Sequence, residues 1–423
     1  CPWCNGNDYR NKKPELCLHR EILDFTRWIV LTSEEKYLIA TLTARMQTVL
    51  NIIWPGSKII YTGASLSNTM IGSDSVEYTI INLPNDDSSA TQLEILQQAL
   101  TTIKALRKSE IKDGLLQGIE NPNGLRISIS LNNIDGIIQG QREKKAIELY
   151  PALYPLVILV KFFIFQSRLD EKFSHNLAFQ ISMSIIQSAP PQKKLDLGYL
   201  SSQFLKFFGT SFNYIACGIS IRNGGFFFNR LDKSKKCSIN WKSPNAICIE
   251  DPLHPGSFIG NDMNDIFGFR SRCYECFQRL KRVKNDCLDA RGTGRDGCPQ
   301  SLLTSFLNRP DFIIRQRADK IRNYQAMIGN AITSFDLTEV DSNEGKNKRK
   351  GFDKNQSNNK YKSKDDHYRY DRNKNDHYNS RNDDRDNSSR NERSYDRGKK
   401  FNKDSNKRDQ YQRNYEKKKP YRR

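Results

Sequence analysis

Two spacings of apolar residues alternate along roughly the first 330 positions of this 423-residue chain. Apolar side chains three or four positions apart predict amphipathic helices, because residues at that spacing share one helix face. Thr32 or Ser33 is the predicted N-cap of the second helix, with Glu35 in its first turn and Pro55 beyond its end. The predicted helices cover residues 19–29, 33–53, 92–106, 143–166 with breaks near Pro151 and Pro155, 174–187, 197–208, 270–283 and 302–329.

Strands are predicted where apolar and polar residues alternate, since successive side chains of a strand point to opposite faces. Residues 58–61 form one short strand, Gly63 follows as a tight turn, and a short polar helix leads to a second strand over 76–83. Two more strands are predicted over 111–119 and 125–131, with the turn sequence NPNG between them. This segment therefore mixes strands and helices, whereas the chain that follows is mainly helical.

The strand after the Gly63 turn carries the candidate chemistry. A nucleotidyltransferase palm begins with a strand, a tight turn and a second strand whose carboxylates lie two residues apart. Together with a third carboxylate from a neighbouring strand, they can hold two Mg²⁺ ions for phosphoryl transfer. The two positions at this spacing are Ser75 and Glu77, so one carboxylate is present. Asp74 and Glu77 are three residues apart and would point to opposite faces of a strand.

Five segments extend this pattern over roughly residues 1–330, namely WPGSKIIYTGAS (54–65), LHREILDFTRWI (18–29), LGYLSSQFLKFFGTSFNY (197–214), GISIRNGG (218–225) and IEDPLHPG (249–256). In their order and spacing they resemble the noncanonical poly(A) RNA polymerases of the nuclear TRAMP type, also called DNA polymerase sigma. No single segment is decisive, and the order and spacing together carry the resemblance.

The resemblance implies an α+β fold with three parts. These are a polymerase-beta-like nucleotidyltransferase palm, a helical poly(A)-polymerase-associated central domain and a disordered basic C-terminal tail. The central domain takes two segments of the chain, because the family closes the palm with helices from both sides. The implied division is an arm over 1–17, a central domain over 18–39 and 139–330, a palm over 40–138 and a tail over 331–423.

The resemblance also assigns site residues. The three carboxylate positions of the family fall on Ser75, Glu77 and Ser128, so Glu77 is the candidate metal ligand. The family uses Mg²⁺ or Mn²⁺ together with ATP. The positions that contact the nucleotide in the family correspond to Gly63, Ala64, Lys161, Phe179, Gln180 and Asn261.

Several of these positions depart from the family or have a second interpretation. Ala64 stands where the family has a phosphate-holding serine, and His175 and Asn176 stand where it has two glycines. Lys161 is equally well interpreted as a lysine at a helix edge whose ammonium extends to solvent. Phe179, next to Gln180 at the position of a base-stacking tyrosine, has a second interpretation as a buried core residue.

Two functions remain open on these residues. The first is a template-independent RNA 3′-adenylyltransferase. The second is a protein of nuclear RNA processing and surveillance on the same fold, with lost or greatly reduced transferase activity, that acts as a scaffold for RNA and proteins. The replaced carboxylates favour the second. The resemblance also implies a nuclear location, and as partners RNA, a zinc-knuckle RNA-binding protein and an exosome-linked DExH-box helicase.

Charge and composition add a further prediction about the C-terminal segment. The net charge is +20, and residues 341–423 contain 27 Lys and Arg against 15 Asp and Glu. This segment has no Leu, Ile, Val, Met, Trp or Cys, so it is predicted to be disordered. Its Tyr, Arg and Lys residues suit loose contact with single-stranded nucleic acid, although a solubilising tail would have the same composition.

The remaining composition argues against a membrane segment and for reduced cysteines. The chain has no run of 18 or more apolar residues, which predicts no transmembrane helix. Two Cys-x-x-Cys pairs occur at 1–4 and 273–276, and the second falls in a predicted helix. A zinc site would need both pairs on loops, so reduced cysteines are the favoured interpretation.

Overall fold

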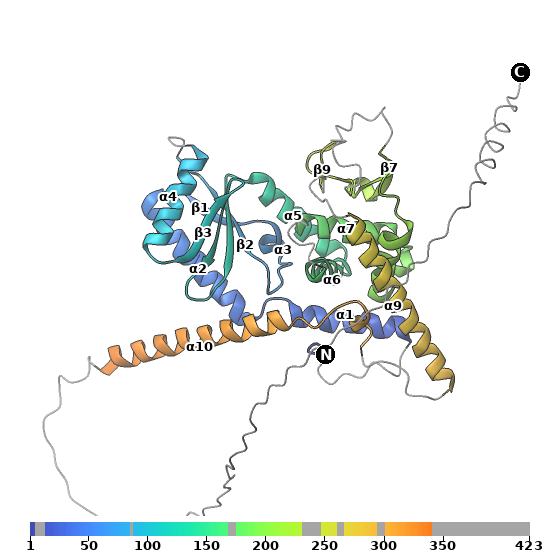
Figure 1. Ribbon diagram of the computed structural model, residues 1–423. Helices are drawn as coiled ribbons and strands as arrows, with labels where there is room; N and C mark the ends of the chain where they lie inside the picture. The colour runs from blue at the N-terminus through green and yellow to red at the C-terminus, as the bar shows by residue number, and fades with distance from the viewer. Residues whose placement is uncertain are drawn as a thin grey trace, which may run out of the picture. The chain divides into compact units, whose positions relative to one another are not determined.

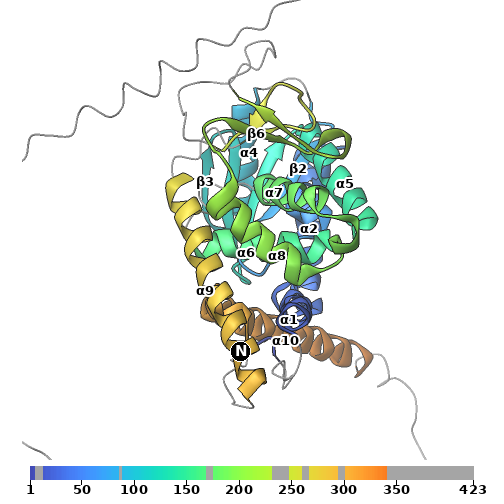
Figure 2. The same cartoon turned by 90° about the vertical axis from the view of Figure 1, so that its right-hand side faces the viewer.

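The computed structural model describes residues 1–4, 13–84, 88–167, 175–230, 247–259, 266–293 and 301–340. Within these ranges the chain forms two large hydrophobic cores and one small cluster around Phe228 and Cys248. One large core lies beneath a five-stranded sheet and the other lies among the first helix and the later helices, and Figures 1 and 2 show how these elements are arranged. No helix in the described ranges is long and apolar enough to cross a bilayer.

Ten α-helices are present in the described residues. They are α1 (Pro14–Ile29), α2 (Ser33–Ile53), α3 (Gly63–Ser67), α4 (Ser89–Thr102), α5 (Ile134–Leu149), α6 (Leu153–Gln166), α7 (His175–Ser188), α8 (Leu197–Lys206), α9 (Ile266–Thr293) and α10 (Asp311–Val340).

The palm is a sheet in the strand order β1-β2-β5-β4-β3 (Figure 1). Strands β2 and β5 run parallel, and the other neighbouring pairs are antiparallel. The strands are β1 (Lys58–Tyr61), β2 (Val76–Ile81), β3 (Leu106–Lys112), β4 (Leu115–Glu120) and β5 (Arg126–Leu131).

One face of this sheet is apolar and forms the palm core. Val76, Tyr78 and Ile80 of β2, and Ile127 and Ile129 of β5, are each at most 1% exposed. Helices α2 and α4 pack against this face (Figure 1). The alternation predicted for these two strands is therefore confirmed, and the polar residues between them lie on the opposite face.

The edge of the sheet differs from the prediction. Residues 111–119, predicted as one strand, instead form parts of β3 and β4, with a hairpin turn at Asp113 and Gly114. The backbone φ angles there are +52° and +73°, which an Asp-Gly pair accepts more readily than most residues. The helix predicted over 92–106 lies too far along the chain, since α4 runs from Ser89 to Thr102.

The second core is built around helix α6. Its residues are apolar on all sides, and Leu156, Val157 and Ile158 are fully buried. A helix that is apolar all round needs neighbours on every side. Helix α1 packs against α6 and α8, so the N-terminal helix joins the later helices as expected.

The division between the two cores falls earlier than the expected boundary at 39/40. Leu38 and Ile39 of α2 belong to the palm core, so the chain changes cores between α1 and α2. Helix α2 begins with a capping box, in which Thr32 Oγ1 accepts the N–H of Glu35 at 3.2 Å and Glu35 Oε2 accepts the N–H of Thr32 at 3.1 Å. Such a cap stabilises a helix start by about 1 kcal/mol.

A second, small sheet was not predicted from the sequence. Its order is β7-β6-β8-β9, and none of its strands exceeds four residues. Strands this short leave too few residues for an alternating pattern to be recognised. They are β6 (Cys217–Ser220), β7 (Phe226–Asn229), β8 (Ile249–Glu250) and β9 (Phe258–Ile259).

Helix α10 connects the two cores. It continues to Val340, beyond the expected boundary at residue 331, while the tail prediction for 341–423 lies outside the described residues. Arg317 donates hydrogen bonds to three carbonyl groups at the end of α1, including that of Val30. Lys320 donates to Glu35 Oε1 of α2 at 3.0 Å, so one helix is tied to both parts.

Candidate functional site

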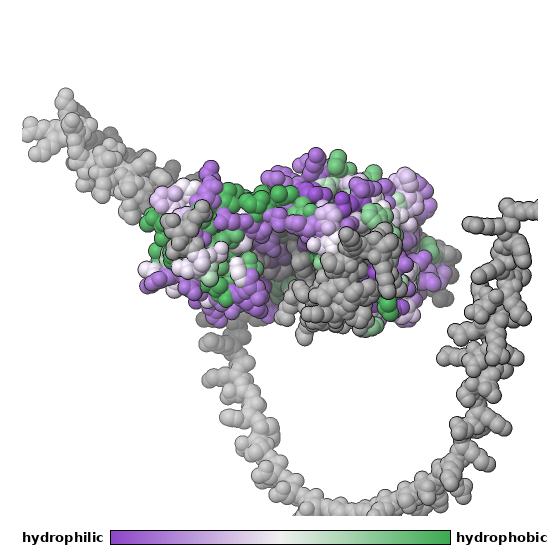
Figure 3. All heavy atoms as spheres, turned by 90° about the horizontal axis from the view of Figure 1, so that it is seen from above, coloured by the Kyte–Doolittle hydropathy of each residue, from purple (hydrophilic) through white to green (hydrophobic). Residues whose placement is uncertain are grey.

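The open face of the palm sheet carries the carboxylate positions. Glu77 of β2 and Ser128 of β5 are register partners in neighbouring parallel strands, as the predicted site requires. Both line a cavity of about 520 Å³ between the sheet and the later helices. Figure 3 shows mainly hydrophilic residues around the hollow on this side of the molecule. The cavity is also lined by Thr62, Gly63, Tyr78, Leu115, Ser130, Asn133, Asp135, Gly136, Gln139, Glu143, Asn176, Asp251, Leu253 and His254.

Glu77 reaches back onto the turn that precedes it. Its Oε2 accepts the backbone N–H of Ala64 at 3.2 Å, while its own N–H donates to Ser65 Oγ at 2.9 Å. The carboxylate packs so closely that a Cβ on Gly63 would lie 1.8 Å from Glu77 Oε2. Gly63 also has a φ of +49°, so both the backbone angle and the contact require glycine. The carboxylate therefore engages the backbone amide of Ala64, the residue that stands where the resemblance implies a phosphate-holding serine.

The other two carboxylate positions present neutral hydroxyl groups. Ser75 and Ser128 are both partly exposed, but they line different cavities. Ser75 lies in a second cavity of about 350 Å³ that also contains Lys108 and Arg126. Two magnesium ions carry a charge of +4 and require several carboxylate oxygens, and a neighbouring guanidinium adds repulsion. The residues present at these positions therefore do not fit the two-metal site of the family.

Lys161 lies on α6 and contacts the loop between α3 and β2. Its Nζ is 2.5 Å from Asp74 Oδ2 and donates to the carbonyl of Thr69 at 3.2 Å. Asp74 Oδ2 also accepts the N–H of Ile71 at 2.7 Å. Lys161 is not among the residues that line the 520 Å³ cavity. In this arrangement the Lys161 ammonium holds the loop before Ser75 through its contacts with Asp74 and Thr69.

Helix α7 carries the positions compared with the base-stacking segment. Phe179 is 3% exposed and lies in the hydrophobic core, as its second interpretation expects, and Gln180 is fully buried. Asn176 lines the cavity, and its Oδ1 accepts hydrogen bonds from Gln139 and Gln180. The structure thus brings Asn176 to the cavity but not the other two, and Asn261 lies outside the described residues.

Further polar groups line the same cavity that the sequence alone did not single out. Asp135, Gln139 and Glu143 are four residues apart on α5 and therefore share one helix face. This spacing is the signal that could have identified them. Across the cavity, His254 Nδ1 lies 3.2 Å from Asp251 Oδ2 and its Nε2 lies 3.4 Å from Asp135 Oδ2.

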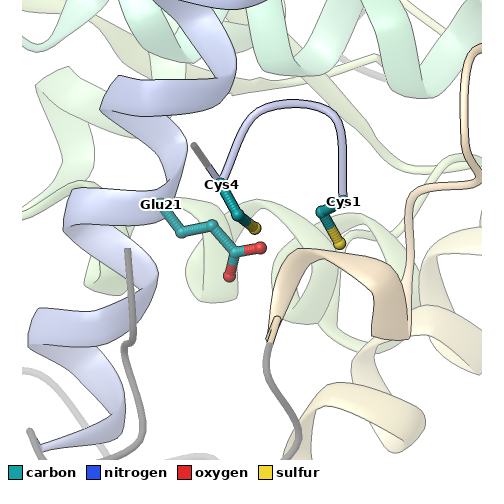
Figure 4. Close-up of side chains that lie close together, drawn as sticks. All are labelled: Cys1, Cys4 and Glu21. Atoms are coloured by element: carbon teal, nitrogen blue, oxygen red, sulfur yellow. The ribbon is translucent and has the colours of Figure 1, made fainter. Parts of the chain in front are cut away.

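One group of three metal-ligand residue types occurs in the described part of the chain, namely Cys1, Cys4 and Glu21 (Figure 4). Glu21 is fully buried, and its two oxygens already accept hydrogen bonds from Trp3, Ser301, Leu302 and Leu303. Burial raises the pKa of the Cys4 thiol, and the nearby Glu21 carboxylate raises it further. With four donors already bound, the Glu21 carboxylate links the N-terminal residues to residues 301–303 in this structure.

Three comparisons with known proteins bear on this geometry. A family profile described as Cid1 family poly A polymerase matches residues 196–256, the stretch that contains α8 and β6 to β8. Poly(A) RNA polymerase cid14 of Schizosaccharomyces pombe is 24% identical over 370 residues, which cover 81% of this chain and 52% of that protein. The solved polymerase core of TRAMP, a RNA surveillance complex, superposes with a TM-score of 0.64 and 20% identity, covering 72% of this chain and 99% of that one.

Together these comparisons support a place for the chain among the noncanonical poly(A) RNA polymerases. The structural likeness also establishes the nucleotidyltransferase polymerase fold with its palm and helical part. The chain spans about half the length of cid14. Another relative is the inactive non-canonical poly(A) RNA polymerase protein Trf4-2 of Drosophila melanogaster, 25% identical over 351 residues that cover 76% of this chain and 80% of that protein.

Proposed function

We propose that this family member has no, or greatly reduced, RNA 3′-adenylyltransferase activity and acts in RNA processing as a scaffold for RNA and proteins. The observation that carries the proposal is the state of the three carboxylate positions. Ser75 and Ser128 are hydroxyls, and the remaining Glu77 is engaged with the Ala64 amide.

Electrostatics explain why these changes matter together. Metal ions supply most of the charge neutralisation in phosphoryl transfer, a contribution of several kcal/mol. Each 1.4 kcal/mol corresponds to a factor of ten in rate. Three other carboxylates line the cavity, but Asp135 and Glu143 come from α5 and Asp251 comes from a distant loop. They therefore do not replace the two carboxylates that the resemblance implies at the positions of Ser75 and Ser128.

The direct test is an adenylation assay on an oligo(A) primer with ATP and either Mg²⁺ or Mn²⁺. We compare the unmodified protein with Ser75→Asp, Glu77→Asp and Ser128→Asp, singly and combined, and with Ala64→Ser added. The combined variant is expected to exceed the unmodified protein by roughly 10³-fold or more, because several kcal/mol of metal stabilisation would return.

Glu77→Ala in the unmodified protein is the matched control. Strong adenylation that survives Glu77→Ala would contradict the proposal. Activity that Glu77→Ala abolishes would establish the alternative function, a transferase built on a single glutamate. Absence of activity in every variant, with fold and stability unchanged, would mean that more than the metal ligands has been replaced.

The resemblance of the central helical part to its relatives supports the partner proposal. The polymerase core of TRAMP belongs to an RNA surveillance complex, and we extend to this chain a nuclear location and a role in RNA surveillance. The proposed partners are RNA, a zinc-knuckle RNA-binding protein and an exosome-linked DExH-box helicase. A pulldown from nuclear extract that recovers neither protein would contradict this part of the proposal.

A further inference from the structure

The open face of the palm sheet has a regular arrangement of charges. Register partners Glu77, Ser128, Gln117 and Glu110 form one row across β2, β5, β4 and β3. The adjacent row places Arg126 of β5, Ile119 of β4 and Lys108 of β3 side by side. Because strands lie about 4.8 Å apart, the two cations of this second row are separated by two strand spacings, roughly 10 Å.

Ser75 lies at the end of this second row. It is two residues before Glu77, as Arg126 is two residues before Ser128 in the parallel partner strand. Ser75, Lys108 and Arg126 all line the cavity of about 350 Å³. The first carboxylate position of the family is therefore occupied by a hydroxyl in a cavity that also contains a guanidinium and an ammonium group.

The two neighbouring cavities differ in charge. The 520 Å³ cavity is lined by the carboxylates of Glu77, Asp135, Glu143 and Asp251, without a lysine or arginine among the described lining residues. The 350 Å³ cavity is lined by two cations and by one carboxylate, Glu110. The surroundings of Ser75 thus carry a net positive charge, whereas Glu77 and Ser128 line the acidic cavity.

Both cations are available for a ligand. Lys108 and Arg126 are exposed, and within the described part of the chain neither takes part in a salt bridge. The matching Ser75 hydroxyl is partly exposed on the same side. A guanidinium, an ammonium and a hydroxyl on a concave surface are the groups that bind phosphate oxygens in proteins, and the guanidinium does so through two parallel N–H bonds.

We propose that Ser75, Lys108 and Arg126 hold a phosphate group directly, without a divalent cation, and that this phosphate belongs to the backbone of single-stranded RNA. The proposal rests on the RNA-binding role proposed above, and it states where the palm contacts the RNA. The site is open along β3, the edge strand of the sheet, so a continuous strand can pass over it. The phosphate of a free nucleotide shares this chemistry and is the alternative source.

The experiment measures RNA binding by the full chain in EDTA across a series of salt concentrations. The variants are Lys108→Gln and Arg126→Gln, alone and combined. Loss of one phosphate contact on a single strand should lower the slope of log affinity against log salt by about 0.7, so the double variant should lose about 0.7 in total. Arg107→Gln is the matched control, because Arg107 is exposed on the same strand as Lys108 but lies beside Gly124, outside the cavity.

A second measurement locates the contact without a mutation. Oligonucleotides that contain 4-thiouridine are crosslinked to the unmodified protein in EDTA, and the attached peptides are identified by mass spectrometry. We expect crosslinks within residues 106–131, and these should disappear in the double variant. This readout separates the palm site from any RNA contact elsewhere in the chain.

Unchanged affinity, salt slope and crosslinks in the double variant would overturn the inference. A loss confined to ATP binding in EDTA, with RNA binding unaffected, would also overturn it and would assign the phosphate to a nucleotide. Neither result depends on the adenylation assay, so the proposed lack of transferase activity is tested independently of the RNA contact. A salt slope that falls as far in Arg107→Gln as in Arg126→Gln would contradict a localised site.

Discussion

The two faces of the palm sheet differ in what they retain. On the covered face, Tyr78 and Ile129 are almost fully buried against α2 and α4. On the open face, the neighbouring residues Glu77 and Ser128 stand where the family has metal-binding carboxylates. Because side chains alternate along a strand, one face can keep its packing while the other changes its chemistry. The fold is therefore no evidence that the reaction is retained.

The largest expected effect tests this separation within one strand. Ile129→Ala should lower the free energy of unfolding by about 2–5 kcal/mol, because it leaves a cavity in the palm core. Its neighbour Ser128 points to the open face and lies outside the palm core. Ser128→Ala should therefore change the free energy of unfolding by less than about 0.5 kcal/mol. Denaturant titration of both variants measures the difference. If Ser128→Ala lowered the free energy of unfolding by more than about 2 kcal/mol, the two faces of the sheet would not be independent.

An intermediate effect is expected at Lys161, which pairs with Asp74. The two side chains are 12% and 16% exposed, so solvent screens the pair only partly. Lys161→Met should lower stability by about 1.5–3 kcal/mol without any nucleotide present, since hydrogen bonds to charged groups contribute that much. Lys145→Met, at an exposed position of α5, is the control. Equal stability of the two variants would show that Lys161 does not fasten the loop.

The smallest expected effect concerns pH and the buried carboxyl of Glu120. Burial raises the pKa of Glu120, although hydrogen bonds from Asn123 and the Arg45 guanidinium act in the opposite direction. The folded protein then binds the proton more tightly than the unfolded chain. Stability should therefore fall as the pH rises from the ordinary glutamate pKa of 4.5 to the raised value, and stay constant above it.

Glu120→Gln removes this titration. Melting curves recorded over a pH series should show a smaller decline in the variant across that window, whereas the exposed control Glu110→Gln should follow the unmodified protein. An identical pH profile in Glu120→Gln and the unmodified protein would contradict the assigned pKa shift.

The elements that frame the site could be predicted because their patterns are local. The strand before Gly63, the short polar helix after it and the alternation in β2 and β5 are visible in the sequence and are present in the structure. The Asp113-Gly114 pair is equally visible in the sequence, and it marks the hairpin turn that the single strand predicted over 111–119 overlooks.

Other features of the site depend on contacts between distant residues. The bond between Glu77 and the Ala64 amide depends on the extra methylene of glutamate and on its rotamer, which no spacing reveals. The row that places Lys108 near Arg126 depends on the register of three strands. The burial of Phe179 follows from the packing of α7 rather than from its match to a family position.

The central claim, that the palm has lost its metal site, is tested most directly by Mn²⁺ binding followed by electron paramagnetic resonance. The full-length protein is titrated with Mn²⁺ in parallel with the variant that combines Ser75→Asp, Glu77→Asp and Ser128→Asp, both with and without ATP. The account predicts no specific Mn²⁺ binding to the unmodified protein, with or without ATP, and saturable binding to the combined variant. Saturable binding to the unmodified protein that Glu77→Ala abolishes would contradict the account.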